Sequence, residues 1–191
     1  MLRTILLGLA MVIASVAPAL SQIKAQIPAN VGPDWDKGIQ PIGQENYYKA
    51  IDCGKAGGEN PGCLFYDAGF CKNDDFVLTL YTPYKYVALQ VWNAVRQKKD
   101  VPTPSYGTAG RTPLTLGISA VKGSKNPIAS VVIKRGGKTI EPRSRSIDGT
   151  SGSFTFDFAT WAPTADITIE MAGKAATRTC LVPRVVLSRF R

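Results

Sequence analysis

The sequence contains no histidine, and this limits the chemistry that its side chains can do. Imidazole is the general base of histidine-dependent serine and cysteine hydrolases and the commonest metal ligand, so both uses are excluded. The densest group of oxygen-bearing side chains consists of Asp67, Asn73, Asp74 and Asp75. Calcium prefers carboxylate and amide oxygens, which makes these residues a candidate calcium site. Their spacing differs from that of the helix-loop-helix calcium loop, and Asn-Asp-Asp equally favours a turn.

Residues 119–122 read Ser-Ala-Val-Lys, the spacing at which a lysine activates a serine nucleophile in penicillin-binding proteins. Those enzymes also carry S-D-N and K-T-G elements, which this sequence lacks, and here the tetrapeptide falls on a predicted strand. We therefore expect a non-catalytic protein without a cofactor. A small hydrolase that uses two carboxylates and no histidine is the alternative.

Positive charge is concentrated in the C-terminal part of the chain. Residues 22–110 carry nine Lys/Arg and nine Asp/Glu, whereas residues 111–191 carry thirteen and five. Five of the basic residues lie on or near one predicted hairpin: Lys134, Arg135, Lys138, Arg143 and Arg145. Such a hairpin could bind an anionic envelope polymer or lipid head groups, whereas nucleic acid is a less favoured partner. A basic surface that only keeps the protein soluble is an equally weighted interpretation.

The N-terminus has the pattern of a secretory signal. Arg3 precedes an uncharged apolar run over residues 4–20 that ends in small residues. We predict a signal peptide over residues 1–21, with cleavage after Ala19 as an alternative, and a secreted or periplasmic location. An uncleaved membrane anchor is the competing interpretation, although the run is at the lower length limit for a span.

An even number of cysteines in an oxidising compartment predicts disulfide bonds. The four residues are Cys53, Cys63, Cys71 and Cys180, and three connectivities are open to them. We favour Cys53 with Cys63 and Cys71 with Cys180. A metal cluster or a redox pair is less favoured, because the chain has neither a C-x-x-C motif nor a histidine.

The elements that position these groups follow from the hydrophobic pattern. Thr82 is a good N-cap, Pro83 suits the first helical position, and apolar residues recur at helical spacing, which predicts an amphipathic helix over residues 82–99. Lys85 falls outside the apolar face assigned to this helix. Alternating residues predict strands over 114–120, 129–134, 138–141, 154–158, 167–171, 176–182 and 184–190.

These elements predict an α+β, mainly β chain. A loop-rich N-terminal part, residues 22–110, is held by disulfides and carries the helix, and a basic antiparallel β-sandwich follows over residues 111–191. The sandwich is expected to be immunoglobulin-like on pattern alone, with a small barrel as the alternative. We expect a binding or accessory protein that contacts polyanions. A third interpretation is a structural partner of another envelope protein, which it would meet by strand addition.

Overall fold

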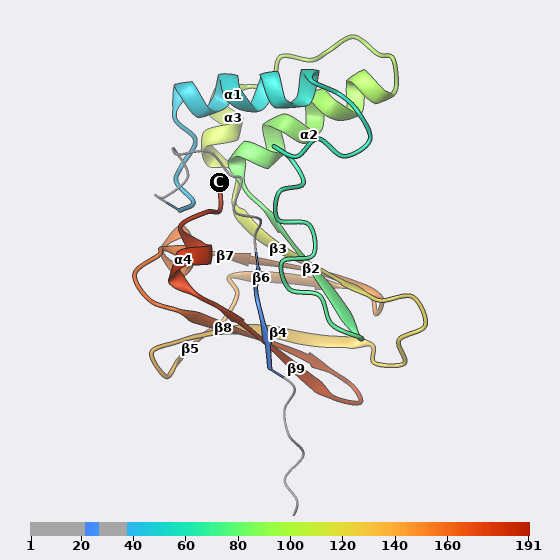
Figure 1. Ribbon diagram of the computed structural model, residues 1–191, viewed down its shortest axis with the longest axis vertical. Coiled ribbons are helices and arrows are strands. Elements are labelled where there is room, and N and C mark those ends of the chain that lie inside the picture. The colour runs from blue at the N-terminus through green and yellow to red at the C-terminus, as the bar shows by residue number, and fades with distance from the viewer. Residues whose placement is uncertain (1–21, 27–37) are drawn as a thin grey trace, which may run out of the picture.

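Alternating apolar and polar residues build two β-sheets in the computed structural model, which describes residues 22–26 and 38–191 (Figure 1). The five-stranded sheet has the order β1 (Gln22–Lys24), β9 (Thr177–Val182), β8 (Ile167–Gly173), β4 (Ile128–Arg135) and β5 (Lys138–Ile140). The four-stranded sheet has the order β2 (Phe76–Tyr81), β3 (Leu114–Ala120), β7 (Ser151–Phe156) and β6 (Ser144–Ile147). Paired strands are antiparallel, except that β1 runs parallel to β9.

The two sheets share one apolar core, as in a sandwich. Every second residue of the inner strands is buried, because successive side chains of a strand point to opposite faces. The strand residues that form this core include Phe76, Leu78, Leu80, Leu116, Ile118, Val131, Ile133, Phe154, Phe156, Ile169 and Met171. Trp161 and Phe190 pack edge to face at one end of this core. The fold is therefore α+β with a β-sandwich-like body.

Strands from both sides of residue 110 build this body. β1 and β2 come from residues 22–110, yet each pairs with a strand of the C-terminal part. β2 is missing from the strands predicted above. Its outward residues, Val77, Thr79 and Tyr81, are themselves apolar or β-branched, and this hides the alternation on which strand prediction depends.

A layer of helices covers one end of the sheets (Figure 1). It contains α1 (Gln44–Lys55), α2 (Pro83–Arg96) and α3 (Tyr106–Arg111). α1 packs closely on α2 at Gly54, where a Cβ atom would lie 2.6 Å from Val91 Cβ. The predicted start of α2 is confirmed, since the Thr82 hydroxyl accepts a hydrogen bond from the Lys85 amide at 3.2 Å.

Both favoured disulfides are confirmed. Cys53–Cys63 joins α1 to the loop that follows it, and Cys71–Cys180 links the segment before β2 to β9 inside the core. Such bonds indicate an oxidising, extracytoplasmic environment. No helix among residues 22–26 and 38–191 is long and apolar enough to cross a membrane. The predicted signal peptide, residues 1–21, lies outside the described residues.

The expected strand over residues 184–190 is wrong. The segment forms the short helix α4 (Arg184–Leu187), which starts after Pro183. Val186, Leu187 and Phe190 are buried, and this spacing of one, three and four residues fits a helical turn against the core. The strand expected to reach Phe158 also ends early, because Phe158–Trp161 is a turn of 3₁₀ helix.

Candidate binding site

Tyr81 stands where the sandwich meets the helical layer. It is the last residue of β2, and α2 begins two residues later. On the neighbouring strand, α3 leads through Pro113 into β3, and Thr115 of β3 pairs in register with Tyr81. The junction between β2 and α2 thus lies beside the junction between α3 and β3. The Tyr81 side chain is 43% exposed between them.

The first hollow at Tyr81 is a groove of about 610 Å³ between the two junctions. Its surface is mainly apolar, with a few polar groups at the margins. Tyr86, Leu89, Gln90 and Asn93 of α2 form one wall, and Thr108, Arg111, Thr112 and Pro113 form the other. Apolar concavities with a few polar groups are the usual form of a small-molecule site.

The second hollow, of about 360 Å³, lies on the outer face of the four-stranded sheet. Its floor is a row of small residues in register across all four strands: Thr79, Gly117, Ser153 and Ser146. The Tyr81 ring leans over Gly117, where a Cβ atom would lie 2.9 Å from Tyr81 Cε2. Asp148 lies at the margin. Hydrogen bonds from Ser151 hold the pKa of its carboxyl below the ordinary value.

The third hollow is a cavity of about 180 Å³ behind Tyr81. Leu64, Phe65 and Ala68 line it together with Thr79 and with Leu89 of α2. Its charged residues are Asp67 and Lys85, which are 1% and 3% exposed. Lys85 Nζ donates a hydrogen bond to Asp67 Oδ1 and lies 5.0 Å from the centre of the Tyr66 ring.

Burial governs the titration of this pair. Desolvation raises the pKa of Asp67, and the attraction of Lys85 offsets this only in part. Desolvation likewise lowers the pKa of Lys85 against the effect of Asp67. Asp67 Oδ2 is buried and has no hydrogen-bond partner of good geometry, although the nearby backbone amides of Asp67 and Leu80 also lower its pKa.

Three of the five predicted basic binding residues are engaged within the protein. Lys134 pairs with Glu170 at 2.6 Å and Arg143 pairs with Asp157 at 2.5 Å. The Arg135 guanidinium donates to three backbone carbonyls, those of Ala159, Thr160 and Ala162. Lys138 and Arg145 are exposed and have no partner among the described residues. The hairpin therefore offers fewer free charges than its sequence indicates.

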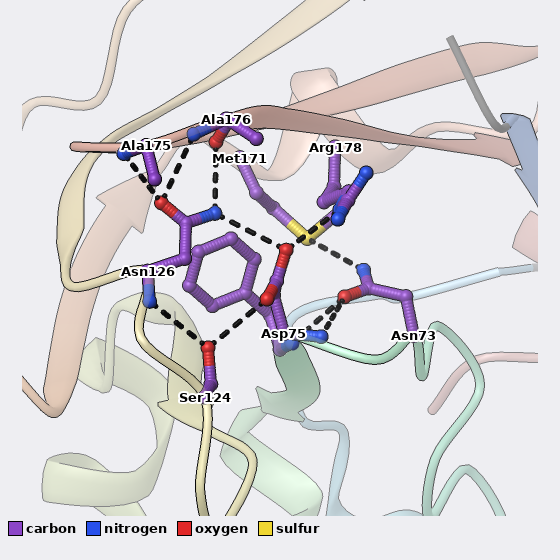
Figure 2. A network of polar contacts seen from close by, with 9 residues as sticks. Asn73, Asp75, Ser124, Asn126, Met171, Ala175, Ala176 and Arg178 are labelled. Atoms are coloured by element: carbon purple, nitrogen blue, oxygen red, sulfur yellow. Dashed lines mark hydrogen bonds and ion pairs between the residues drawn. The ribbon is translucent and has the colours of Figure 1, made fainter. Parts of the chain in front are cut away.

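The structure gives the four calcium candidates different roles. Figure 2 shows Asp75 held by Arg178, Asn126 and Ser124, at 2.7, 3.2 and 3.0 Å. Asn73 Oδ1 accepts from the backbone amides of Asp75 and Phe76, which fixes the turn before β2. Asp67 pairs with Lys85, and Asp74 is exposed. Within the described ranges, no three His, Cys, Asp or Glu residues are grouped so that they could hold a metal ion.

The sequence pattern overlooked Tyr81 and misplaced Lys85. Lys85, Ala88 and Trp92 are spaced by three and four residues, so Lys85 belongs to the buried face of α2. That spacing was a usable signal. Tyr81 carried no comparable signal, because its importance arises from the neighbours that the fold brings around it.

Comparisons with protein-family models, with curated proteins and with solved structures find no match to this chain. Fold and site define its class: a disulfide-bonded α+β protein with a β-sandwich-like body and a candidate binding site where that body joins a helical layer.

Proposed function

We propose that this chain is a secreted or periplasmic, non-catalytic binding protein whose ligand lies over Tyr81. One observation carries the proposal: three hollows of different chemistry meet at this half-exposed aromatic ring. An aromatic side chain offers a large contact area at a low cost in conformational entropy, and aromatic residues are enriched where binding energy is concentrated.

The chemistry of the hollows indicates the class of ligand. The groove between α2 and α3 is mainly apolar, whereas the sheet face presents hydroxyl groups that both donate and accept hydrogen bonds. Only Arg111 and Asp148 add charge to these two hollows. An elongated, uncharged molecule with an apolar end and a hydroxyl-rich end fits this surface.

The same lining argues against the carboxylate hydrolase. Hydrolysis of a glycosidic bond by two carboxyl groups needs both of them at one site. Asp148 is the single carboxylate of the sheet-face hollow, Asp67 is that of the small cavity, and the groove has none.

The sandwich is proposed to be immunoglobulin-like. The order β2-β3-β7-β6 corresponds to the A-B-E-D sheet of that fold, and β9-β8-β4-β5 corresponds to G-F-C-C′. On this reading, α2 and α3 are an insertion between the first two strands of the A-B-E-D sheet. The insertion builds the groove wall beside Tyr81.

The test uses n-octyl glucoside below its micelle concentration, as an uncharged probe with an alkyl tail and a sugar head group. In ¹H–¹⁵N NMR titrations, saturable shifts are expected at Tyr81, Thr82, Thr115 and Gly117. Tyr81→Ala should weaken binding about tenfold, equivalent to about 1.4 kcal/mol. Tyr48→Ala is the matched control, since Tyr48 is 56% exposed on α1 and lines none of the three hollows. Shifts scattered over the surface, or equal losses in both variants, would refute the proposal.

Strand addition is a second candidate function, supported by β6. This strand ends the four-stranded sheet, and all four of its residues are exposed. No described strand pairs with its outer edge. An open edge of this kind can accept a strand from a protein partner. Cross-linking at a cysteine introduced in place of Ser146 would report such a partner.

A further inference from the structure

Lys85 and Asp67 meet inside the protein, away from solvent. Lys85 lies in the first turn of α2, on the face that packs inward, and Asp67 follows the loop closed by Cys53–Cys63. Both side chains are almost fully buried, and Nζ contacts the carboxyl group directly. The apolar side chains of Leu64, Phe65, Ala68 and Leu89 lie around the same cavity.

As an ion pair, this arrangement is poorly satisfied. Removing two charges from water is costly, and the attraction between them offsets this cost only when further hydrogen bonds complete the site. Here Asp67 Oδ2 has no hydrogen-bond partner of good geometry, although the backbone amides of Asp67 and Leu80 lie near the carboxyl group. The lysine ammonium has one hydrogen-bonded carboxyl oxygen and the face of the Tyr66 ring. A neutral linkage would remove both charges and one of the two carboxyl oxygens.

We propose that Lys85 and Asp67 become joined by an isopeptide bond between Nζ and Cγ. The lone pair of the neutral amine attacks Cγ of the protonated carboxyl group and forms the C–N bond. One carboxyl oxygen leaves after accepting a proton from Nζ, so that one water molecule is lost and one amide remains. No oxidant, reductant or other reactant is consumed.

The surroundings favour the reactive forms of both groups. Burial raises the pKa of Asp67 and lowers the pKa of Lys85, which shifts the pair towards the neutral acid and the neutral amine. The carbonyl carbon of the neutral acid is more electrophilic than that of the carboxylate, and its hydroxyl group can leave as water. The apolar surroundings also disfavour the return of water that would hydrolyse the amide.

The chain contains a matched control in Lys134 and Glu170. Their side chains also form a direct contact, at 2.6 Å, but they are 44% and 28% exposed. Neither side chain is buried, so the desolvation that acts on Lys85 and Asp67 is absent here and no bond is expected. If contact alone were sufficient, this pair would react as well.

Intact mass spectrometry of the oxidised, purified protein tests the proposal without a variant. The expected mass is that of the chain less four hydrogens for the two disulfides and less one water molecule. The water deficit must survive reduction and denaturation. Proteolysis should yield one branched peptide that contains both Asp67 and Lys85, with no tryptic cleavage after Lys85.

Three results would overturn the proposal. The first is a folded, aged sample that lacks the water deficit, which would leave the pair as a buried ion pair only. The second is a water deficit that maps to Asp148-Gly149, because the Asp148 side chain can react with the Gly149 backbone nitrogen to form a cyclic succinimide, which also loses one water molecule. The third is a deficit retained in Lys85→Met, whose apolar side chain of similar length suits the buried position. None of these results bears on ligand binding at Tyr81.

Discussion

Arg178 of β9 donates a hydrogen bond from Nε to Asp75 Oδ2 at 2.7 Å, across 103 residues of sequence. Asp75 directly precedes β2, so this ion pair joins the start of β2 in one sheet to β9 in the other. Ser124 and Asn126 complete the site, and Asn126 Oδ1 also accepts from the amides of Ala175 and Ala176 (Figure 2). Asp75, one of the four calcium candidates, therefore has a structural role as the partner of Arg178.

The Asp75 site should make stability depend on pH. Burial raises the pKa of Asp75, but the hydrogen bonds from Arg178, Asn126 and Ser124 outweigh this and hold it below the ordinary value. A lowered pKa in the folded state stabilises the protein above about pH 4, where an unfolded aspartate is ionised, and the gain is lost as the pH falls through the folded pKa. Asp75→Asn should therefore lower the free energy of unfolding by about 1–2 kcal/mol at about pH 6 and by less at about pH 3. Urea unfolding at both pH values measures this, and an equal loss at both would contradict it.

Arg135 should contribute to stability more than Lys138 does. Arg135→Ser removes charged donors from three carbonyls around the 3₁₀ turn and should cost about 2 kcal/mol. Lys138→Ser should change the free energy of unfolding by less than about 0.5 kcal/mol, because Lys138 is exposed and unpartnered among the described residues. Equal urea midpoints for the two variants would show that the Arg135 contacts are dispensable.

Polyanion binding, if it occurs through the hairpin, should depend on Lys138 and Arg145. We expect the double variant Lys138→Ser/Arg145→Ser to elute from an anionic matrix and from anionic vesicles at lower salt than the unaltered protein, with an unchanged melting temperature. Lys98→Ser/Lys99→Ser, in the segment that directly follows α2, is the charge-matched control. If both variants elute alike, the positive charge acts only as a general surface property.

Gly117 should control the position of Tyr81. In Gly117→Ala the new Cβ would meet the Tyr81 ring, which can move because it is the outer part of an exposed side chain. We expect a displaced ring and weaker binding of n-octyl glucoside, with a stability change below about 1 kcal/mol. Gly62→Ala is the control, since no atom lies within 4 Å of its added Cβ. Unchanged affinity in Gly117→Ala would show that the Tyr81 ring is not part of the binding surface.

The two disulfides should differ in their contribution to stability. Cys71 and Cys180 are 109 residues apart, whereas Cys53 and Cys63 are 10 apart. The chain-entropy model assigns the longer closure about 2 kcal/mol more, and its loss would also leave a void in the sandwich core. Urea unfolding of Cys71→Ala/Cys180→Ala and Cys53→Ala/Cys63→Ala measures the difference. A larger loss in the second variant would mean that the helical layer limits stability.

Local chemistry made several elements predictable from the sequence. The start of α2 follows from Thr82 and Pro83, whose side chains act within one helical turn, and the helix ends three residues before the predicted residue 99. The alternation in β3, β4 and β8 reports burial on one face of a strand. The favoured disulfide pairs are also confirmed. β2 and α4 were missed, because Val77, Thr79 and Tyr81 mask a period of two and short apolar runs fit more than one element.

The sequence by itself determined the number of cysteines, the position of the main helix, most strands and the excess of positive charge. Only the tertiary structure decided which charges are free, because Lys134, Arg135 and Arg143 find partners that lie between 14 and 36 residues away. It also placed Lys85 against Asp67 and gathered three hollows around Tyr81. The physical reason is that periodicity and capping act within a few residues, whereas a side chain's partner depends on how distant segments pack against each other.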